Sequence, residues 1–215
     1  MASTRVIRNI NYTLTTHCNM KCPDCCAGIT ALPKSLKSFY DWDYVVNSAK
    51  YFQGMSINLT GGEPSVHPLF EEFVPKIKEL FNAPVLSVWT NGTMFKKKPE
   101  VWKYFDVIHI SNYTNESFYG SPDNTSSIEW IKEYLKDTDV KIYDTKVVHQ
   151  PLTDRGTKKC FRGYSDTVEF VDGRIYPCSS SSGLPTKINL ELCEDWQEKI
   201  LSLNPPCYEC LFAEK

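Results

Sequence analysis

The chain has 215 residues, a formal net charge of -2 and 41% hydrophobic residues, enough apolar content for one core domain with a small appendage. Its lysines and arginines are scattered, and the one basic run, Lys96–Lys98, sits beside a proline, which argues against a nucleic-acid partner. No apolar run approaches the ~18 residues of a membrane span, and the N-terminus lacks the basic and apolar regions of a secretion signal. We therefore expect a cytoplasmic protein with no membrane partner.

Nine cysteines cannot all pair in disulfides, and unpaired thiols are typical of a reducing compartment. The first three, Cys18, Cys22 and Cys25, are spaced x3 and x2 after an apolar stretch at 10–14 that predicts a strand. A structural zinc site and a 4Fe-4S cube both normally take four protein ligands. Three thiols on one loop would leave one metal position open for a small molecule. The alternative is a zinc knuckle that includes Cys26, which could otherwise be a buried structural thiol.

Hydrophobic periodicity predicts alternating strands and helices along the first 150 residues. We expect strands at 10–14, 56–60, 85–89, 107–111 and 140–148. We expect helices over 41–52, 68–81, 99–105 and 128–135. Asp41 or Asp43 can cap the first helix, and Pro75 should kink or restart the second.

This alternation indicates an α/β fold with parallel strands and right-handed crossovers. Five strands are too few for a closed eight-stranded barrel, so residues 1–150 should form an open, partial (β/α) barrel. The functional site of such folds lies where the strands end. The cysteine loop, Gly61–Pro64, Asn91 and Ser111 all follow predicted strands and should meet at one edge.

Several side chains near this edge have chemistry that suits a ligand. Gly61 and Gly62 would let the backbone approach a ligand closely, although a Gly-Gly pair can also be a simple tight turn. Glu63 offers a carboxylate that could hold an ammonium group. The histidines His17 and His149 could also reach a ligand, but a structural or solvated role is favoured for both.

From about residue 150 the alternation stops, and prolines and glycines predict a loop-rich second module over 151–215. A hairpin is predicted from 167–171 and 174–176 around an Asp-Gly turn. The hairpin should bring together the cysteines on either side of it, and a later Cys-x2-Cys pair would complete a set of four thiols. This set comprises Cys160, Cys178, Cys207 and Cys210. A zinc ribbon with four cysteine ligands is the structural alternative.

The order of three motifs resembles the radical S-adenosylmethionine (radical SAM) superfamily: the cysteine loop, then Gly61-Gly62-Glu63-Pro64, then Thr90-Asn91-Gly92. The resemblance implies a 4Fe-4S cube held by Cys18, Cys22 and Cys25, with S-adenosylmethionine on its open iron. It implies that the segment Gly61–Pro64 hydrogen-bonds the methionyl amine. It also places three further positions near the nucleoside: Asp24 by the adenine, where the family often has an aromatic residue, and Ser111 with Asn112 by the ribose, although a role in turn formation is the alternative for that pair.

The second cysteine group resembles the Twitch module, a shortened relative of SPASM, in which Cys-x17-Cys and a later Cys-x2-Cys hold another 4Fe-4S cube. The resemblance implies two 4Fe-4S clusters and a reductant such as flavodoxin or ferredoxin. It implies reductive cleavage of S-adenosylmethionine to a 5'-deoxyadenosyl radical that removes a hydrogen atom from a polar substrate.

Oxidation is the expected outcome, because a second cluster could accept the electron left on the substrate radical. An epimerase with Cys193 as hydrogen donor and a maturase of a ribosomal peptide are the alternatives, and Cys193 could instead be a buried structural thiol. A metal-stabilised binding module without turnover is the alternative of another class. No peptide-recognition domain precedes the cysteine loop, which favours a small polar molecule over a peptide as substrate.

Overall fold

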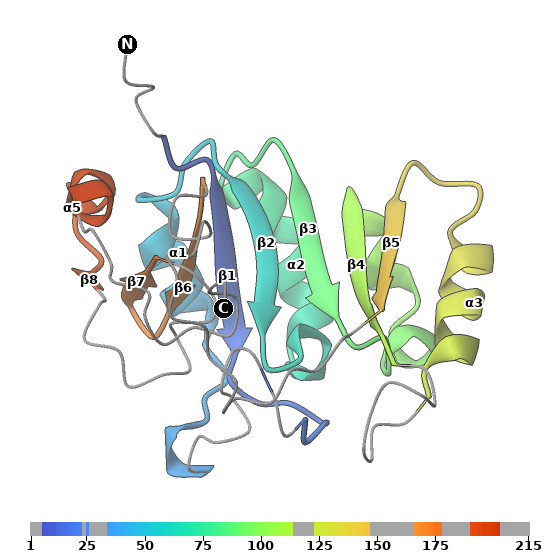
Figure 1. Cartoon of the computed structure of the whole chain (residues 1–215). Helices are drawn as coiled ribbons and strands as arrows, with labels where there is room; N and C mark the ends of the chain where they lie inside the picture. The colour runs from blue at the N-terminus through green and yellow to red at the C-terminus, as the bar shows by residue number, and fades with distance from the viewer. Residues whose placement is uncertain are drawn as a thin grey trace, which may run out of the picture.

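The computed structural model describes residues 6–22, 25, 34–113, 123–146, 166–177 and 190–202. Their centre is one eight-stranded sheet in the order β5-β4-β3-β2-β1-β6-β7-β8 (Figure 1). The strands are β1 (Asn9–Thr15), β2 (Ser56–Gly61), β3 (Leu86–Thr90), β4 (Val107–Asn112), β5 (Lys141–Lys146), β6 (Thr167–Val171), β7 (Arg174–Tyr176) and β8 (Leu190–Glu191). The helices are α1 (Trp42–Ala49), α2 (Phe70–Leu80), α3 (Thr125–Tyr134) and α5 (Trp196–Ser202). The 3-10 turns are η2 (Lys34–Leu36), η3 (Pro64–Val66), η4 (Phe95–Lys97) and η5 (Glu100–Tyr104).

The predicted alternation of strands and helices is confirmed. Strands β1 to β5 pair in parallel with their neighbours in chain order. Helices α1 and α2 lie against one face of this sheet (Figure 1), and η5 and α3 make the next two connections. The protein is therefore an α/β partial barrel, and the C-terminal ends of β1 to β4 lie at one edge.

Local sequence signals explain where the helices begin and run. Helix α1 begins after Asp41, whose carboxylate accepts a hydrogen bond from the Tyr44 N–H at 2.8 Å. Helix α2 runs through Pro75 as one element, so the predicted restart does not occur. Proline removes the hydrogen bond to the carbonyl four residues earlier, and that residue, Glu71, lies in the exposed first turn, where water can take the place of the missing donor.

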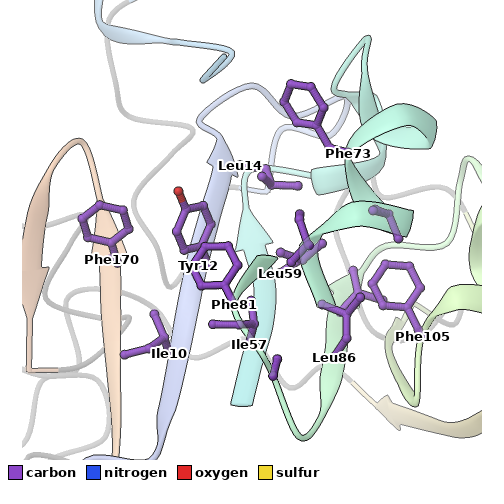
Figure 2. Close-up of a cluster of buried hydrophobic side chains, with 14 of the residues drawn as sticks. Ile10, Tyr12, Leu14, Ile57, Leu59, Phe73, Phe81, Leu86, Phe105 and Phe170 are labelled. Atoms are coloured by element: carbon purple, nitrogen blue, oxygen red, sulfur yellow. The ribbon is translucent and has the colours of Figure 1, made fainter. Parts of the chain in front are cut away.

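The core lies between the sheet and helices α1 and α2 (Figure 2). Tyr12 of β1 is fully buried, and its hydroxyl bonds Ser48 of α1 at 2.8 Å. Its ring packs edge-on against Phe81, with ring centroids 5.4 Å apart, and at a tilt against Phe170 of β6, with ring centroids 5.2 Å apart. Burial raises the pKa of Tyr12 well above its ordinary value. Strand β6 thus shares the core of β1, although 150 residues of sequence separate them.

The predicted hairpin is confirmed in β6 and β7, whose Asp172 and Gly173 adopt positive φ angles of 53° and 71°. Strand β6 pairs in parallel with β1, so the hairpin extends the barrel sheet. The predicted boundary at residue 150 falls outside the described residues and stays a prediction. Among the described helices, none is long and apolar enough to cross a membrane.

Candidate active site at the C-terminal edge of the sheet

The two glycines after β2 allow a very close approach to the start of the cysteine loop. A Cβ on Gly61 would stand 2.1 Å from the carbonyl oxygen of Thr15, and one on Gly62 would stand 2.0 Å from that of His17. The same carbonyls accept hydrogen bonds from the N–H groups of Gly62 at 2.8 Å and Glu63 at 2.9 Å. The two glycines therefore let the turn after β2 pack against the end of β1 and the start of the cysteine loop. Contact with a ligand stays a prediction.

Glu63 is only 1% exposed, and protein donors surround its carboxylate. One oxygen accepts the hydroxyl of Thr90 at 2.8 Å together with the hydroxyl and the N–H of Ser65. The other accepts the N–H of Asn91 at 2.6 Å. Burial raises the pKa of Glu63, and these hydrogen bonds lower it in part. Glu63 thus orders the turn after β3. The next residue, Pro64, begins η3.

Asn91 ties that turn to the cysteine loop. Its amide nitrogen donates to the side-chain oxygen of Asn19 at 2.9 Å, and its oxygen accepts the hydroxyl of Thr93 at 2.6 Å. Asn19 in turn donates to the Thr93 hydroxyl oxygen at 2.7 Å. The three side chains form a closed ring of hydrogen bonds. Sequence reasoning did not single out Asn19, and the only signal was a polar residue between Cys18 and Cys22.

A second asparagine, Asn124, joins the ends of β3 and β4. It is 3% exposed, and its amide nitrogen donates to the carbonyls of Asn91 at 2.9 Å and Ser111 at 2.7 Å. Its side-chain oxygen accepts the N–H of Tyr113 at 2.9 Å. Sequence reasoning missed Asn124, which directly precedes α3 and so resembles an ordinary capping residue. Through it, Ser111 and Asn91 come to the same edge, as predicted.

Cys18, Cys22 and Cys25 lie half-buried on the loop after β1. The Sγ of Cys18 accepts the N–H of Met20 at 3.4 Å. Burial, with smaller contributions from the nearby Glu63 carboxylate and the other two thiols, raises the pKa of the Cys18 thiol to about 12, although the hydrogen bond from Met20 lowers it in part. Among the described residues, no three His, Cys, Asp or Glu side chains are gathered closely enough to hold a metal ion.

The donor set nevertheless fits an iron–sulfur cluster chemically. Thiolates are the ligands that such clusters take in proteins, and an N–H donor to a ligand sulfur tunes the cluster it holds. The loop would still have to close its thiols around the group. Asp24 lies outside the described residues, as do His149 and the four cysteines predicted for a second cluster: Cys160, Cys178, Cys207 and Cys210.

The structure does not bring Cys193 to this edge. It follows β8, the outermost strand, which stands three strand spacings, about 14 Å, from β1. Cys193 is half-buried against the core beside α5, where Lys199 Nζ lies 3.6 Å from its Sγ. This position suits a structural thiol.

His17 stacks on Phe39, with ring centroids 4.0 Å apart. This contact occupies the ring in a local packing interaction next to Cys18. This position agrees with the structural role that the sequence favoured for His17.

Comparison with known proteins adds to this picture. Residues 7–130 match the family described as a 4Fe-4S single cluster domain. The chain is 32% identical over 111 residues to the putative protein YfkA of Bacillus subtilis, which is 49% of this chain and 30% of YfkA. It is 30% identical over 105 residues to a GTP 3',8-cyclase of Mannheimia succiniciproducens, which is 47% of this chain and 31% of the cyclase. The chain thus spans about a third of the length of these curated relatives.

Among solved structures, BtrN in complex with AdoMet and 2-DOIA resembles this fold with a TM-score of 0.66 and 13% sequence identity, over 94% of this chain and 85% of BtrN. The family match makes this partial α/β barrel, with a three-thiol loop at its C-terminal edge, an iron–sulfur protein of the α/β class. The chain belongs to the 4Fe-4S single cluster domain family and is a radical SAM superfamily protein.

Proposed function

We propose that this protein oxidises a small polar substrate by radical chemistry, with Cys18, Cys22 and Cys25 as ligands of a 4Fe-4S cluster. When bound, the cluster supplies the electron that cleaves S-adenosylmethionine to methionine and a 5'-deoxyadenosyl radical. The protein positions the three thiols and the cofactor relative to one another. The observation that carries this proposal is the hydrogen-bonded ring of Asn19, Asn91 and Thr93.

That ring and Glu63 preorganise the edge for a cofactor. Glu63 already accepts four hydrogen bonds from the protein, three at one carboxylate oxygen and one at the other. We infer that Glu63 acts by positioning, and that the backbone carbonyls of Gly61 and Gly62 take the methionyl ammonium. Asn112 Oδ1 is buried without a hydrogen-bond partner among the described residues, which supports a role for Ser111 and Asn112 with the ribose hydroxyls.

Oxidation requires that the substrate lose a hydrogen atom to the 5'-deoxyadenosyl radical, and then one electron and one proton. The four thiols Cys160, Cys178, Cys207 and Cys210 would hold a second 4Fe-4S cluster that takes this electron, and flavodoxin or ferredoxin would reduce the first. The likeness to BtrN, solved with the small molecule 2-DOIA, supports a small polar substrate. An oxygen-sensitive cluster and free thiols suit a reducing cytoplasm.

The decisive experiment measures 5'-deoxyadenosine released by anaerobically reconstituted, reduced protein. We expect about eight irons per chain, and about four in the Cys18→Ala, Cys22→Ala, Cys25→Ala triple variant, which should release none. Zinc in place of iron would support the binding-module alternative. If the triple variant still cleaved S-adenosylmethionine, the assignment of the loop would be wrong.

Once a substrate is known, Cys193→Ala separates oxidation from epimerisation. An epimerase that used this thiol would still form 5'-deoxyadenosine but yield no inverted product. A dehydrogenase should turn over nearly normally, because the electron leaves through the second cluster. The position of Cys193 after the outermost strand β8, away from the candidate site, favours oxidation. Solvent deuterium at the substrate carbon of the product would contradict oxidation.

A further inference from the structure

Two lysines lie where the segment before α1 meets the start of the cysteine loop. The backbone of Ser38 bonds Thr16 twice: its N–H donates to the Thr16 hydroxyl at 2.7 Å, and its carbonyl accepts the Thr16 N–H at 3.0 Å. Lys37 directly precedes Ser38, and Lys34 begins η2, which lies below the arrowhead of β1 in Figure 1. Lys34 is exposed and Lys37 is half-buried. Both lysines are therefore held beside the loop.

A second group of lysines follows the turn after β3. Thr93 in this turn accepts a hydrogen bond from Asn19 of the cysteine loop at 2.7 Å. Lys96 and Lys97 come next, in η4, and both are exposed. Lys21 is also exposed and lies in the cysteine loop itself. Lysines thus stand on both sides of the loop and on it.

An exposed aromatic ring lies between the two groups. Phe39 is 44% exposed, although its ring stacks on His17, the residue before Cys18, with centroids 4.0 Å apart. The Phe39 ring also meets His67 edge-on, with centroids 5.5 Å apart, and the His67 carbonyl accepts a hydrogen bond from Lys98 Nζ at 3.0 Å. Phe39 therefore connects the cysteine loop to the lysines that follow β3. An apolar centre inside a charged rim is the pattern of a docking site.

These side chains form a basic face on a chain whose formal net charge is -2. The face comprises Phe39 and the lysines Lys21, Lys34, Lys37, Lys96 and Lys97. Among the described residues, none of these lysines is in an ion pair, whereas those of α2, η5, α3 and α5 pair with carboxylates. The described carboxylates around the face are engaged: Glu63 is buried, Asp41 and Asp123 bond helix N-termini, and Glu71 acts on Lys98. The face therefore suits an acidic partner.

We propose that the basic face docks a flavodoxin, which delivers the electron for the cluster. The inference rests on the proposed function and names the docking site of its partner. An acidic carrier complements the lysines, and the hydrocarbon edge of its flavin complements the exposed ring of Phe39. The anionic flavin hydroquinone gives one electron and keeps its proton as the neutral semiquinone, and the 4Fe-4S cluster takes that electron.

The position of Phe39 separates this partner from the cofactor. His67, which Phe39 contacts, packs against Phe73 of α2 with ring centroids 5.1 Å apart. Phe39 therefore lies on the side of the sheet that the helices cover. A carrier docked there reaches the cysteine loop from the helix side, which leaves the inner side of the open barrel to the cofactor and the substrate.

The test measures binding to the reconstituted holoprotein, so it needs no turnover. The probe is a purified flavodoxin in its oxidised form, and calorimetry gives its dissociation constant. The salt concentrations are about 0.01 M and about 0.15 M, where the Debye length is about 30 Å and about 8 Å. We expect the dissociation constant to rise about tenfold between them, because salt screens the attraction between the two proteins.

The lysines and the aromatic ring should have separate signatures. Lys34→Glu with Lys37→Glu should weaken binding about tenfold at low salt and much less at high salt. Phe39→Ala should weaken it about tenfold at both salt concentrations, because the burial of an apolar ring is not screened. Lys50→Glu with Lys141→Glu is the matched control. These two exposed lysines lie at the opposite end of the sheet, before β2 and at the start of β5, and their reversal changes the net charge equally.

Three results would overturn the proposal: no binding of flavodoxin, an equal loss of binding in the control variant, or binding that Phe39→Ala leaves unchanged. Tighter binding of a ferredoxin or of a single-stranded RNA would overturn the choice of partner. Release of 5'-deoxyadenosine with dithionite as reductant tests the proposed function separately. If a protein that binds flavodoxin as expected released none, the proposed function would be refuted and the docking face would stand.

Discussion

The side-chain amide of Asn91 donates to the side-chain oxygen of Asn19 at 2.9 Å, across 72 residues of sequence. This one contact joins the turn after β3 to the loop between Cys18 and Cys22. Since Glu63 holds the N–H of the same Asn91, the loop, the glycine turn and the end of β3 form one hydrogen-bonded unit. The geometry of the thiols therefore depends on residues that would not touch a cluster.

A double-mutant cycle of Asn19→Ala and Asn91→Ala should reveal this coupling. We expect a coupling free energy of about 1 kcal/mol in thermal or denaturant unfolding. The electron paramagnetic resonance spectrum of the reduced cluster should also broaden in either variant, which a purely structural role elsewhere would not cause. Asn47→Ala on the exposed face of α1 is the matched control and should change neither quantity. Strictly additive effects would contradict the coupling.

Gly62→Ala should destabilise the protein by about 1–3 kcal/mol through overpacking against the cysteine loop. Its added Cβ would meet the His17 carbonyl at 2.0 Å and the Cys18 nitrogen at 2.9 Å. Gly54→Ala is the control for this clash. Gly54 has a φ of 74° and no atom within 4 Å of an added Cβ, so its substitution introduces backbone strain without a steric clash. We expect a loss of about 1 kcal/mol there with unchanged iron content. Equal iron loss in both variants would argue against the clash.

Glu63→Gln should cost about 1–3 kcal/mol of stability, because the amide turns a donor toward the N–H of Asn91 or the hydroxyl of Thr90. Ser65→Ala removes one hydroxyl donor to the same carboxylate and should cost less. Chemical denaturation of the anaerobic protein measures both. If Glu63→Gln were neutral, the ordering role assigned to this carboxylate would be wrong.

Glu169 should make the stability of the protein fall as the pH rises. Burial raises the pKa of its carboxyl from 4.5 to about 7, while hydrogen bonds from Thr13 and Thr60 lower it in part. Between these values the folded state binds more protons than the unfolded state, so stability is lost through this window, by up to about 3 kcal/mol. Glu169→Gln should flatten the profile between about pH 4.5 and 7. A profile unchanged by the substitution would show that the carboxyl titrates normally.

Local signals in the sequence were sufficient for much of the fold. The Asp41 cap, the apolar face of α1 and the Asp-Gly turn of the hairpin each depend on residues a few positions apart. The strand ends also placed Gly61 and Asn91 at one edge, because parallel strands end on the same side. These features follow from short-range chemistry.

The contacts that the sequence did not reveal are the long-range ones. Glu169 lies in a short hairpin strand, and its partners Thr13 and Thr60 are 156 and 109 residues away. Nothing local distinguishes it from an exposed strand residue. Asn124 likewise donates to the carbonyls of Asn91, just after β3, and of Ser111 in β4, and no spacing rule predicts that pairing. Such polar contacts depend on sheet register, which is set only when the strands meet.

The parallel pairing of β1 with β6 has a consequence for how the chain folds. Strand β1 lies between β2 and β6, yet β6 is made some 150 residues later. Until β6 docks, one side of β1 is an unpaired strand edge with an alternating apolar pattern. Such an edge is a template for pairing with another molecule. A chain shortened to residue 150 should therefore aggregate during refolding, and the long loop closed between the two strands should make the final docking the slow step.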